Sequence, residues 1–235
     1  MGEKNYIEVG IYMSDQLHMT DKEQAEFESA KKVFETLLED FNTRGLLQKG
    51  IPRERRERLA KMWRQSRQFA LAFNTTFNIF ETAERVKSFT ERNRVDGIDA
   101  QVLTGSFTNQ AIGIFLYDIE TVFKTSLLFF LKEAHGLTKR MEVGKLLNTI
   151  KQISPDIESK LEPLIDLELR NALAHGAVWF EAGGNVYLAP NSYLENIKSL
   201  KLHDFYIRIK KQNIVAHAFI EVLLEKAKQG YFKQI

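Results

Sequence analysis

The sequence predicts a mostly α-helical protein: a helical bundle with a small β-hairpin insertion and an extra N-terminal helical segment. Over most of the 235 residues, apolar side chains recur at three- and four-residue spacing, as on the buried face of an amphipathic helix. Capping residues and glycines mark where these stretches begin and end. Residues 178–188 depart from this pattern, with β-branched and aromatic residues on both sides of two glycines.

The first predicted helix lies in the N-terminal segment, residues 1–95. Thr20 is a typical N-cap, and Glu23, three residues later, completes the pattern of a capping box. Apolar residues then recur at helical spacing up to Phe41, and Gly45 marks the expected end.

The second predicted helix follows Pro52, a residue that suits the first turn of a helix. We expect this helix to extend to about Asn93, with a break near residues 74–76. Residues 95–105 contain two glycines and lack a helical period, so we interpret them as a linker. The linker would separate the N-terminal segment from a second domain, residues 106–235.

The predicted C-terminal domain contains four helices and one hairpin. The expected elements are a helix from Ser106 or Thr108 to His135-Gly136, a helix over 143–153, a helix from Ser154 to His175-Gly176, a hairpin over 178–188 and a helix over 202–228. Ser154-Pro155-Asp156 is a typical helix start, because it combines a cap, a first-turn proline and a first-turn acid. Gly183-Gly184 suits the positive φ values of a tight two-residue turn.

Composition excludes several classes of site. The chain has no cysteine, which excludes disulfides, thiolate metal sites and cysteine nucleophiles. Its histidines show no recognised ligand spacing, so we expect no metal site and no cofactor. The formal net charge is +2, so affinity for nucleic acid has to come from a local patch.

The sequence also argues against a membrane location. The most apolar window, residues 111–131, contains Asp118, Glu120 and Lys124, which favours a buried helix over a membrane span. The N-terminus lacks the apolar core of a signal peptide, so we expect a cytoplasmic protein.

The most informative stretch is Leu-Arg-Asn-Ala-Leu-Ala-His-Gly at residues 169–176. Asn171 and His175 are four residues apart and therefore share a helix face. Arg170 lies roughly 140° from His175 around the helix, so its side chain must curl round to meet the imidazole at one phosphate, or meet it across a dimer. A guanidinium can bind a phosphate through two hydrogen bonds, and an imidazole can transfer a proton near neutral pH. These groups suit RNA cleavage without a metal.

This stretch resembles the signature of HEPN domains, in which Arg, a polar residue and a short spacer precede His and often Gly. The resemblance covers roughly residues 106–231. It implies a HEPN-like bundle and a metal-independent endoribonuclease, in the role of a toxin or phage-defence effector, that works by 2'-hydroxyl attack on phosphate. It further implies that His175 acts as general acid or base, that Arg170 holds the phosphate and that Asn171 orients the pair.

The resemblance also implies partners. These are RNA, a second copy of the chain whose motif faces the same cleft, and an antitoxin or another protein. Other interpretations stay open. Asp166 could form a helix salt bridge with Arg170, and His175 could complement the helix dipole. A HEPN-like module without catalysis could bind RNA, a nucleotide or a protein, and a plain helical scaffold is a third reading.

Arg64 and Arg67 are weaker RNA-binding candidates. They belong to a basic run over residues 53–67 that could follow RNA phosphates. Glu54 and Glu57 interrupt this run, and such runs are more often solvated helix faces.

Trp179 and Tyr187 are candidates for stacking on a base. Both lie in the predicted hairpin, which directly follows Gly176 and is therefore expected at the rim of the proposed cleft. The alternative is that these aromatic rings cover the end of the bundle.

Overall fold

The structure is a computed structural model. It describes residues 19–48, 50–90, 97–130, 141–181, 184–189, 196–229 and 233–234. In this part of the chain the protein is mostly helical and carries a small three-stranded antiparallel sheet. The predicted fold class is therefore confirmed at the level of a mostly α protein with a small β insertion.

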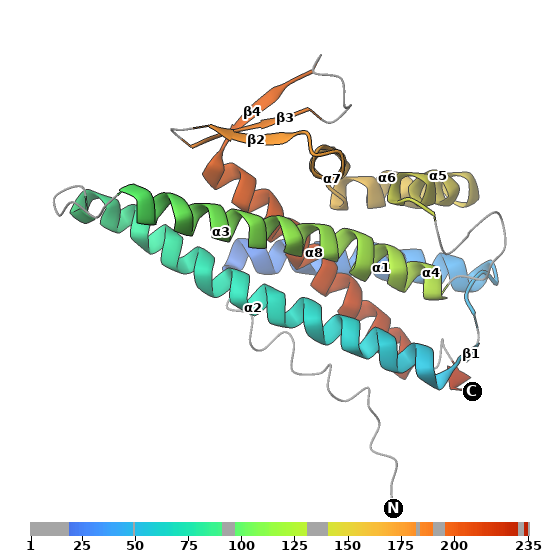
Figure 1. The fold of residues 1–235 in the computed structure, drawn as a ribbon. Helices are drawn as coiled ribbons and strands as arrows, with labels where there is room; N and C mark the ends of the chain where they lie inside the picture. Colours follow the sequence, from blue (N-terminus) through green and yellow to red (C-terminus); the bar gives the residue numbers. More distant parts are fainter. Residues whose placement is uncertain are drawn as a thin grey trace, which may run out of the picture.

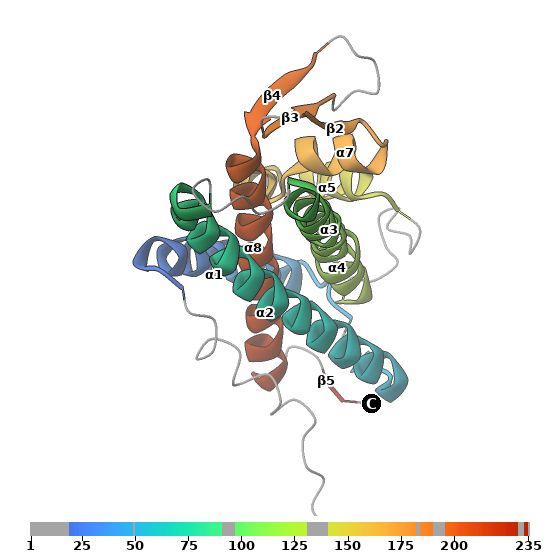
Figure 2. The ribbon, with the colours of Figure 1, turned by 60° about the vertical axis from the view of Figure 1, so that its left-hand side comes forward.

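Long helices make up most of the structure, and Figure 1 shows how they cross. They are α1 (Asp21–Thr43), α2 (Arg53–Thr90), α3 (Gly97–Leu116) and α8 (Leu202–Lys228). The chain of α3 continues through a π-helical segment, η3 (Tyr117–Thr125), into α4 (Ser126–Phe130). Figures 1 and 2 both place this continuous rod between α2 and the short helices beneath the sheet.

The first predicted helix is confirmed at both ends. The Thr20 hydroxyl accepts a hydrogen bond from the Glu23 backbone N–H, and the Glu23 carboxylate accepts one from the Thr20 backbone N–H. Gly45 has a φ of 67°, the left-handed conformation that favours glycine after a helix end.

The predicted break and the predicted linker are both wrong. Helix α2 runs through residues 74–76 without interruption, and α3 already begins at Gly97. Tertiary packing supports the middle of α3. The Phe107 ring stacks on Phe73 of α2 at 5.5 Å and meets Tyr206 of α8 at 4.8 Å, so α3 is supported against two long helices. Asn93 lies outside the described residues.

The predicted helix from Ser154 to His175 is interrupted. It consists of α6 (Pro155–Leu161), a 3₁₀ turn, η4 (Glu162–Leu164), and a separate helix, α7 (Leu167–Ala174). Pro163 has no N–H and restricts the preceding residue, which favours ending α6 there. Asp166 starts α7 by accepting a hydrogen bond from the Leu169 backbone N–H at 3.0 Å. The short predicted helix before this region is confirmed as α5 (Val143–Ile153), whereas the predicted helix end at His135-Gly136 lies outside the described residues.

The hairpin is confirmed, but its turn is longer than predicted. Strand β2 (Val178–Glu181) pairs antiparallel with β3 (Asn185–Leu188), and the Glu181–Asn185 pair leaves three residues between the strands rather than two. Sequence analysis missed a third strand, β4 (Lys198–Lys201), which pairs with β3. Its sequence, Lys-Ser-Leu-Lys, has one apolar residue and no strand-like alternation. A separate two-residue parallel pair joins β1 (Gly50–Ile51) to β5 (Lys233–Gln234).

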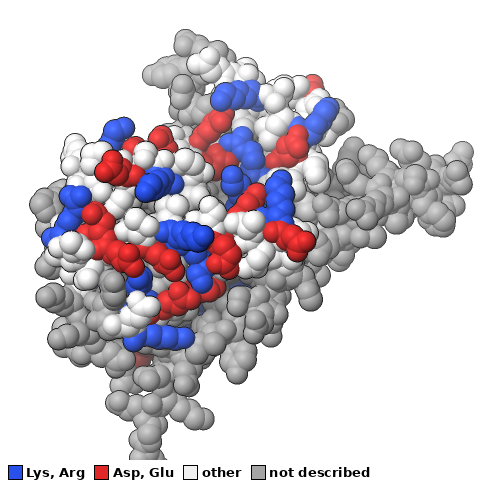
Figure 3. Space-filling model, turned by 180° about the vertical axis from the view of Figure 1, so that it is seen from behind, with Lys and Arg blue, Asp and Glu red and all other residues white. Residues whose placement is uncertain are grey.

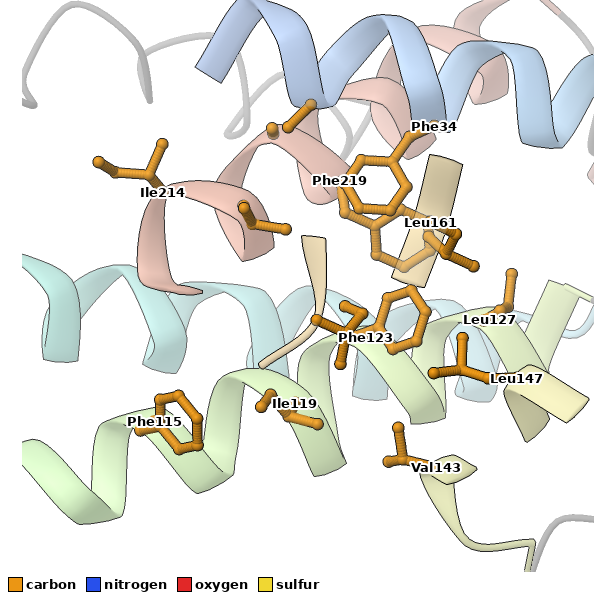
Figure 4. Packing of buried hydrophobic residues seen from close by; sticks show 14 of the residues in the cluster. Phe34, Phe115, Ile119, Phe123, Leu127, Val143, Leu147, Leu161, Ile214 and Phe219 are labelled. Atoms are coloured by element: carbon orange, nitrogen blue, oxygen red, sulfur yellow. The ribbon is translucent and has the colours of Figure 1, made fainter. Parts of the chain in front are cut away.

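One hydrophobic core joins the N-terminal and C-terminal helices. In Figure 4 the rings of Phe34 in α1, Phe123 in η3 and Phe219 in α8 meet at its centre, with centroids 4.7–6.3 Å apart. The predicted division into an N-terminal segment, residues 1–95, and a second domain, residues 106–235, stays a prediction. Among the described residues, no helix is both long enough and apolar enough to cross a bilayer.

Candidate functional site

Helix α7 carries the predicted motif, and α8 fixes its position. Arg208 of α8 donates two hydrogen bonds to the Asp166 carboxylate, from Nε at 2.7 Å and from Nη2 at 2.5 Å. The Gln212 side-chain oxygen accepts the Asp166 backbone N–H at 3.0 Å. Leu169 and Ala172 are buried beneath the helix. Because α8 holds its N-terminus and the core holds its buried face, α7 presents its remaining residues in one defined direction.

The Arg170 guanidinium is held beside Asn171. Its Nε donates to Glu120 Oε1 of η3 at 2.7 Å, and Nη2 contacts the same oxygen. Its Nη1 donates to Asn171 Oδ1 at 3.0 Å. The side chain is 14% exposed. The Arg170 guanidinium therefore lies against Asn171, which shares a helix face with His175.

Glu120 is the partner of Arg170 that sequence analysis did not identify. Its second carboxylate oxygen accepts a charge-assisted hydrogen bond from Lys124. Burial opposes ionisation of Glu120, but the hydrogen bonds from Lys124 and Arg170 outweigh it and hold the pKa of this carboxyl below its usual range. Two cations therefore share one carboxylate, which leaves the cluster with a net positive charge. The sequence showed Glu120 only as one of three charged residues, with Asp118 and Lys124, in an otherwise apolar helix. That pattern argued against a membrane span but did not identify a partner for Arg170.

His175 caps the C-terminal end of α7 and is exposed. Among the described residues, its side chain takes part in no hydrogen bond or ion pair. Gly176, with a φ of 65°, turns the chain into β2 directly afterwards. The imidazole is therefore accessible to a substrate. The alternative pairing of Arg170 with Asp166 does not occur, because Asp166 binds Arg208 instead.

Trp179 and Tyr187 form a stacked pair on the sheet that follows α7. They are directly opposite each other on β2 and β3, with ring centroids 5.7 Å apart and planes within 12°. Trp179 is 37% exposed, and the Tyr187 hydroxyl donates to Glu181 Oε2 at 2.7 Å.

Arg64 and Arg67 lie on α2, which the α3–η3–α4 rod separates from α7 (Figure 2). Arg64 is exposed, and its Nε donates to the Ala60 backbone carbonyl at 3.3 Å. Arg67 is half-buried and lies close enough to His217 of α8 to disfavour its protonation. The structure therefore does not bring these two arginines to the motif.

A second polar cluster lies inside the bundle, where η3 meets α2 and α8. The fully buried Asp118 carboxylate accepts hydrogen bonds from Ser66 at 3.0 Å and Asn213 at 2.7 Å. Burial raises the pKa of Asp118 to about 7, against the effect of these two donors. Burial, together with repulsion from Arg67, lowers the pKa of His217 to about 4.

No cluster of three potential metal ligands occurs within the described ranges. Comparison of the chain with protein-family models, with curated proteins and with solved structures found no match.

Proposed function

We propose that the protein is a metal-independent endoribonuclease whose active site is built on α7, as the resemblance to HEPN domains implies. A role as a toxin or phage-defence effector belongs to the same proposal. The observation that carries it is the hydrogen bond from Arg170 Nη1 to Asn171 Oδ1. This bond holds the cation against a residue that shares a helix face with His175, which supports joint action of the two side chains.

The proposed roles follow from the available atoms. The Nε–H of Arg170 donates to Glu120, but Nη1 and Nη2 each carry a second N–H that can donate to a phosphate oxygen. Glu120 restricts the guanidinium to one orientation, so less rotamer freedom is lost when a phosphate binds. His175, four residues after Asn171, is exposed and carries the proton.

The proposed reaction forms a bond between the 2'-oxygen of a ribose and the adjacent phosphorus. The bond from phosphorus to the 5'-oxygen breaks, which leaves a cyclic phosphate on one fragment and a 5'-hydroxyl on the other. The 2'-hydroxyl gives up its proton to a base, and the 5'-oxygen takes one from an acid. His175 serves as one of these two groups.

The test uses end-labelled RNA, excess chelator and two exposed histidines. Replacing His175→Ala should lower cleavage on the order of 10²-fold or more, because general acid–base catalysis contributes that much. His203→Ala, an exposed histidine at the start of α8, is the matched control and should cleave like wild type. The products should end in cyclic phosphate. Equal activity of His175→Ala and wild type would refute the role of His175, and loss of activity in chelator would refute metal independence.

A second candidate function is a HEPN-like module that binds RNA, a nucleotide or a protein without cleaving it. The engagement of Arg170 by Glu120 favours this reading, because part of the guanidinium's charge is already neutralised. RNA binding without cleavage in the same experiment would support it.

A further inference from the structure

Helix α2 presents an exposed basic stripe after Glu57, and Glu54 and Glu57 lie on the same side of the helix before it. From there to residue 72, the exposed side chains in the described part of α2 are Arg58, Lys61, Arg64, Gln65, Gln68, Leu71 and Ala72. The three cations are spaced three residues apart and lie within an arc of about 120° on the helix surface, at about 100° per residue. This stripe offers charge and amide hydrogen bonds together.

The neighbouring face of α3 carries no charge. Its exposed described residues are Gly105, Ser106, Asn109, Gln110 and Gly113. Helices α2 and α3 lie side by side in both ribbon views (Figures 1 and 2). No described acidic side chain of α3 therefore opposes an anion that binds the α2 stripe.

The stripe leads toward the candidate site across η3. Contacts along the two helices show that α2 runs antiparallel to the rod: Phe73 meets Phe107, Ser66 meets Asp118 and Trp63 meets Ser126. The Tyr117 hydroxyl lies 3.3 Å from Gln65 Oε1, so the cations that precede Gln65 lie level with the part of the rod that follows Tyr117.

This part of η3 carries Glu120 and Lys124, and Glu120 binds Arg170 of α7. On it, Glu120 is the one carboxylate among the described, partly exposed side chains, and two cations already share its charge. The path from α2 to α7 therefore meets no unneutralised acid among the described residues.

The opposite side of the molecule is different. Figure 3 shows acidic and basic side chains intermixed over the back of the structure, so that face has no comparable region of one sign.

We propose that the face formed by Arg58–Ala72 of α2, η3 and α7 binds the sugar–phosphate backbone of single-stranded RNA. This inference rests on the proposed nuclease function for its substrate, because the α2 stripe lies across η3 from the motif and a bound strand reaches the motif only by crossing η3. Arg58, Lys61 and Arg64 contact phosphates, and the strand crosses η3 to reach Arg170. Adjacent helices pack 8–10 Å apart, so the path from α2 to α7 spans roughly 20 Å, or a few nucleotides.

Single-stranded RNA fits better than a duplex for a chemical reason. Attack by the 2'-oxygen requires it to lie in line with the departing 5'-oxygen, and the regular A-form helix holds the two atoms out of line. A flexible strand can adopt the in-line geometry and can also follow a convex surface of crossing helices.

The experiment measures binding of a fluorescent 2'-O-methyl RNA strand, which has no free 2'-hydroxyl and cannot be cleaved. The test variant combines Arg58→Gln, Lys61→Gln and Arg64→Gln. The matched control combines Lys22→Gln, Lys32→Gln and Lys145→Gln, three exposed lysines on α1 and α5 with the same total change in charge. The test variant should bind at least tenfold more weakly than wild type, and the control should bind nearly as well as wild type.

The salt dependence gives a second readout. Loss of three phosphate contacts should lower the slope of log affinity against log salt by about 2, since each contact to a single strand contributes about 0.7.

Equal weakening by the control, equally tight binding of a duplex, or preference for vesicles of anionic lipid over RNA would overturn the inference. If wild type cleaves RNA and the α2 variant binds RNA as tightly as wild type, the proposed binding surface is wrong and the proposed nuclease function stands. RNA binding that depends on α2 in a protein that never cleaves RNA would overturn the nuclease and support the surface.

Discussion

Asp118 and His217 are two buried titratable residues whose pKa values are displaced in opposite directions. Burial raises the pKa of Asp118 to about 7, from 3.8 for an exposed carboxyl, so the folded protein keeps the proton that the unfolded chain has lost. Burial lowers the pKa of His217 to about 4, from 6.5. Between these two pH values the imidazole is neutral in the folded protein and protonated in the unfolded chain. Their effects on stability therefore oppose each other over most of the acidic range.

The sign of each effect follows from proton linkage. The contribution of Asp118 to stability is fully present below about pH 4 and is lost as the pH rises to about 7. The contribution of His217 is fully present above pH 6.5 and is lost as the pH falls to about 4.

We predict that Asp118→Asn gains stability relative to wild type as the pH rises from 4 to 7. The gain should approach about 1.4 kcal/mol per pH unit at most, because one proton is involved. Urea denaturation across this range measures the difference in free energy of unfolding. His217→Phe serves as the opposite case and should gain relative to wild type as the pH falls from 6.5 to 4. Parallel stability curves for wild type and Asp118→Asn would show that Asp118 titrates normally.

At the scale of elements, α7 depends on its N-cap. Asp166 holds the helix start through the Leu169 N–H and holds α8 through Arg208. We predict that Asp166→Ala lowers the free energy of unfolding by about 2 kcal/mol, roughly half from the cap and half from the ion pair.

Asp166→Asn separates the two contributions, because asparagine is also a good cap but carries no charge. Its loss should be about half that of Asp166→Ala. Thermal unfolding measures both, with a fall in Tm of about 2–4 °C per kcal/mol for a chain of this length. Equal losses for the two variants would contradict a capping role.

The hairpin tests whether the rim of the site stacks on RNA. We predict that Trp179→Ala weakens RNA binding about tenfold with little change in Tm, because its ring stacks on Tyr187 within the small sheet. Phe180→Ala is the control, because its ring packs against Phe205 of α8 at 5.4 Å and should lower Tm instead. A large fall in Tm for Trp179→Ala, or no change in either quantity, would refute the rim role.

At the scale of the whole molecule, a single copy presents one guanidinium and one imidazole. A 2'-hydroxyl attack needs both an acid and a base, and α7 supplies one exposed histidine. We predict a two-fold homodimer whose interface lies near Arg170–His175, so that a second imidazole completes the site. Sedimentation at working concentration should show a dimer, and a monomer that cleaves RNA at full rate would contradict the shared cleft.

The sequence by itself determined the helical class, most helix ends and the hairpin. These features depend on local chemistry: Thr20 and Glu23 cap their own helix, and apolar spacing defines each buried face. It also identified Arg170, Asn171 and His175 as neighbours on one helix, because their spacing alone places them there.

Only the tertiary structure decided the features that depend on distant partners. Glu120 reaches Arg170 across 50 residues, and Arg208 reaches Asp166 across 42, so no local pattern could pair them. Strand β4 exists because β3 offers it a hydrogen-bonding edge, and α3 is supported by α2 and α8 through the Phe107 ring. Each of these contacts is made between segments that the sequence separates and that the shared core brings together.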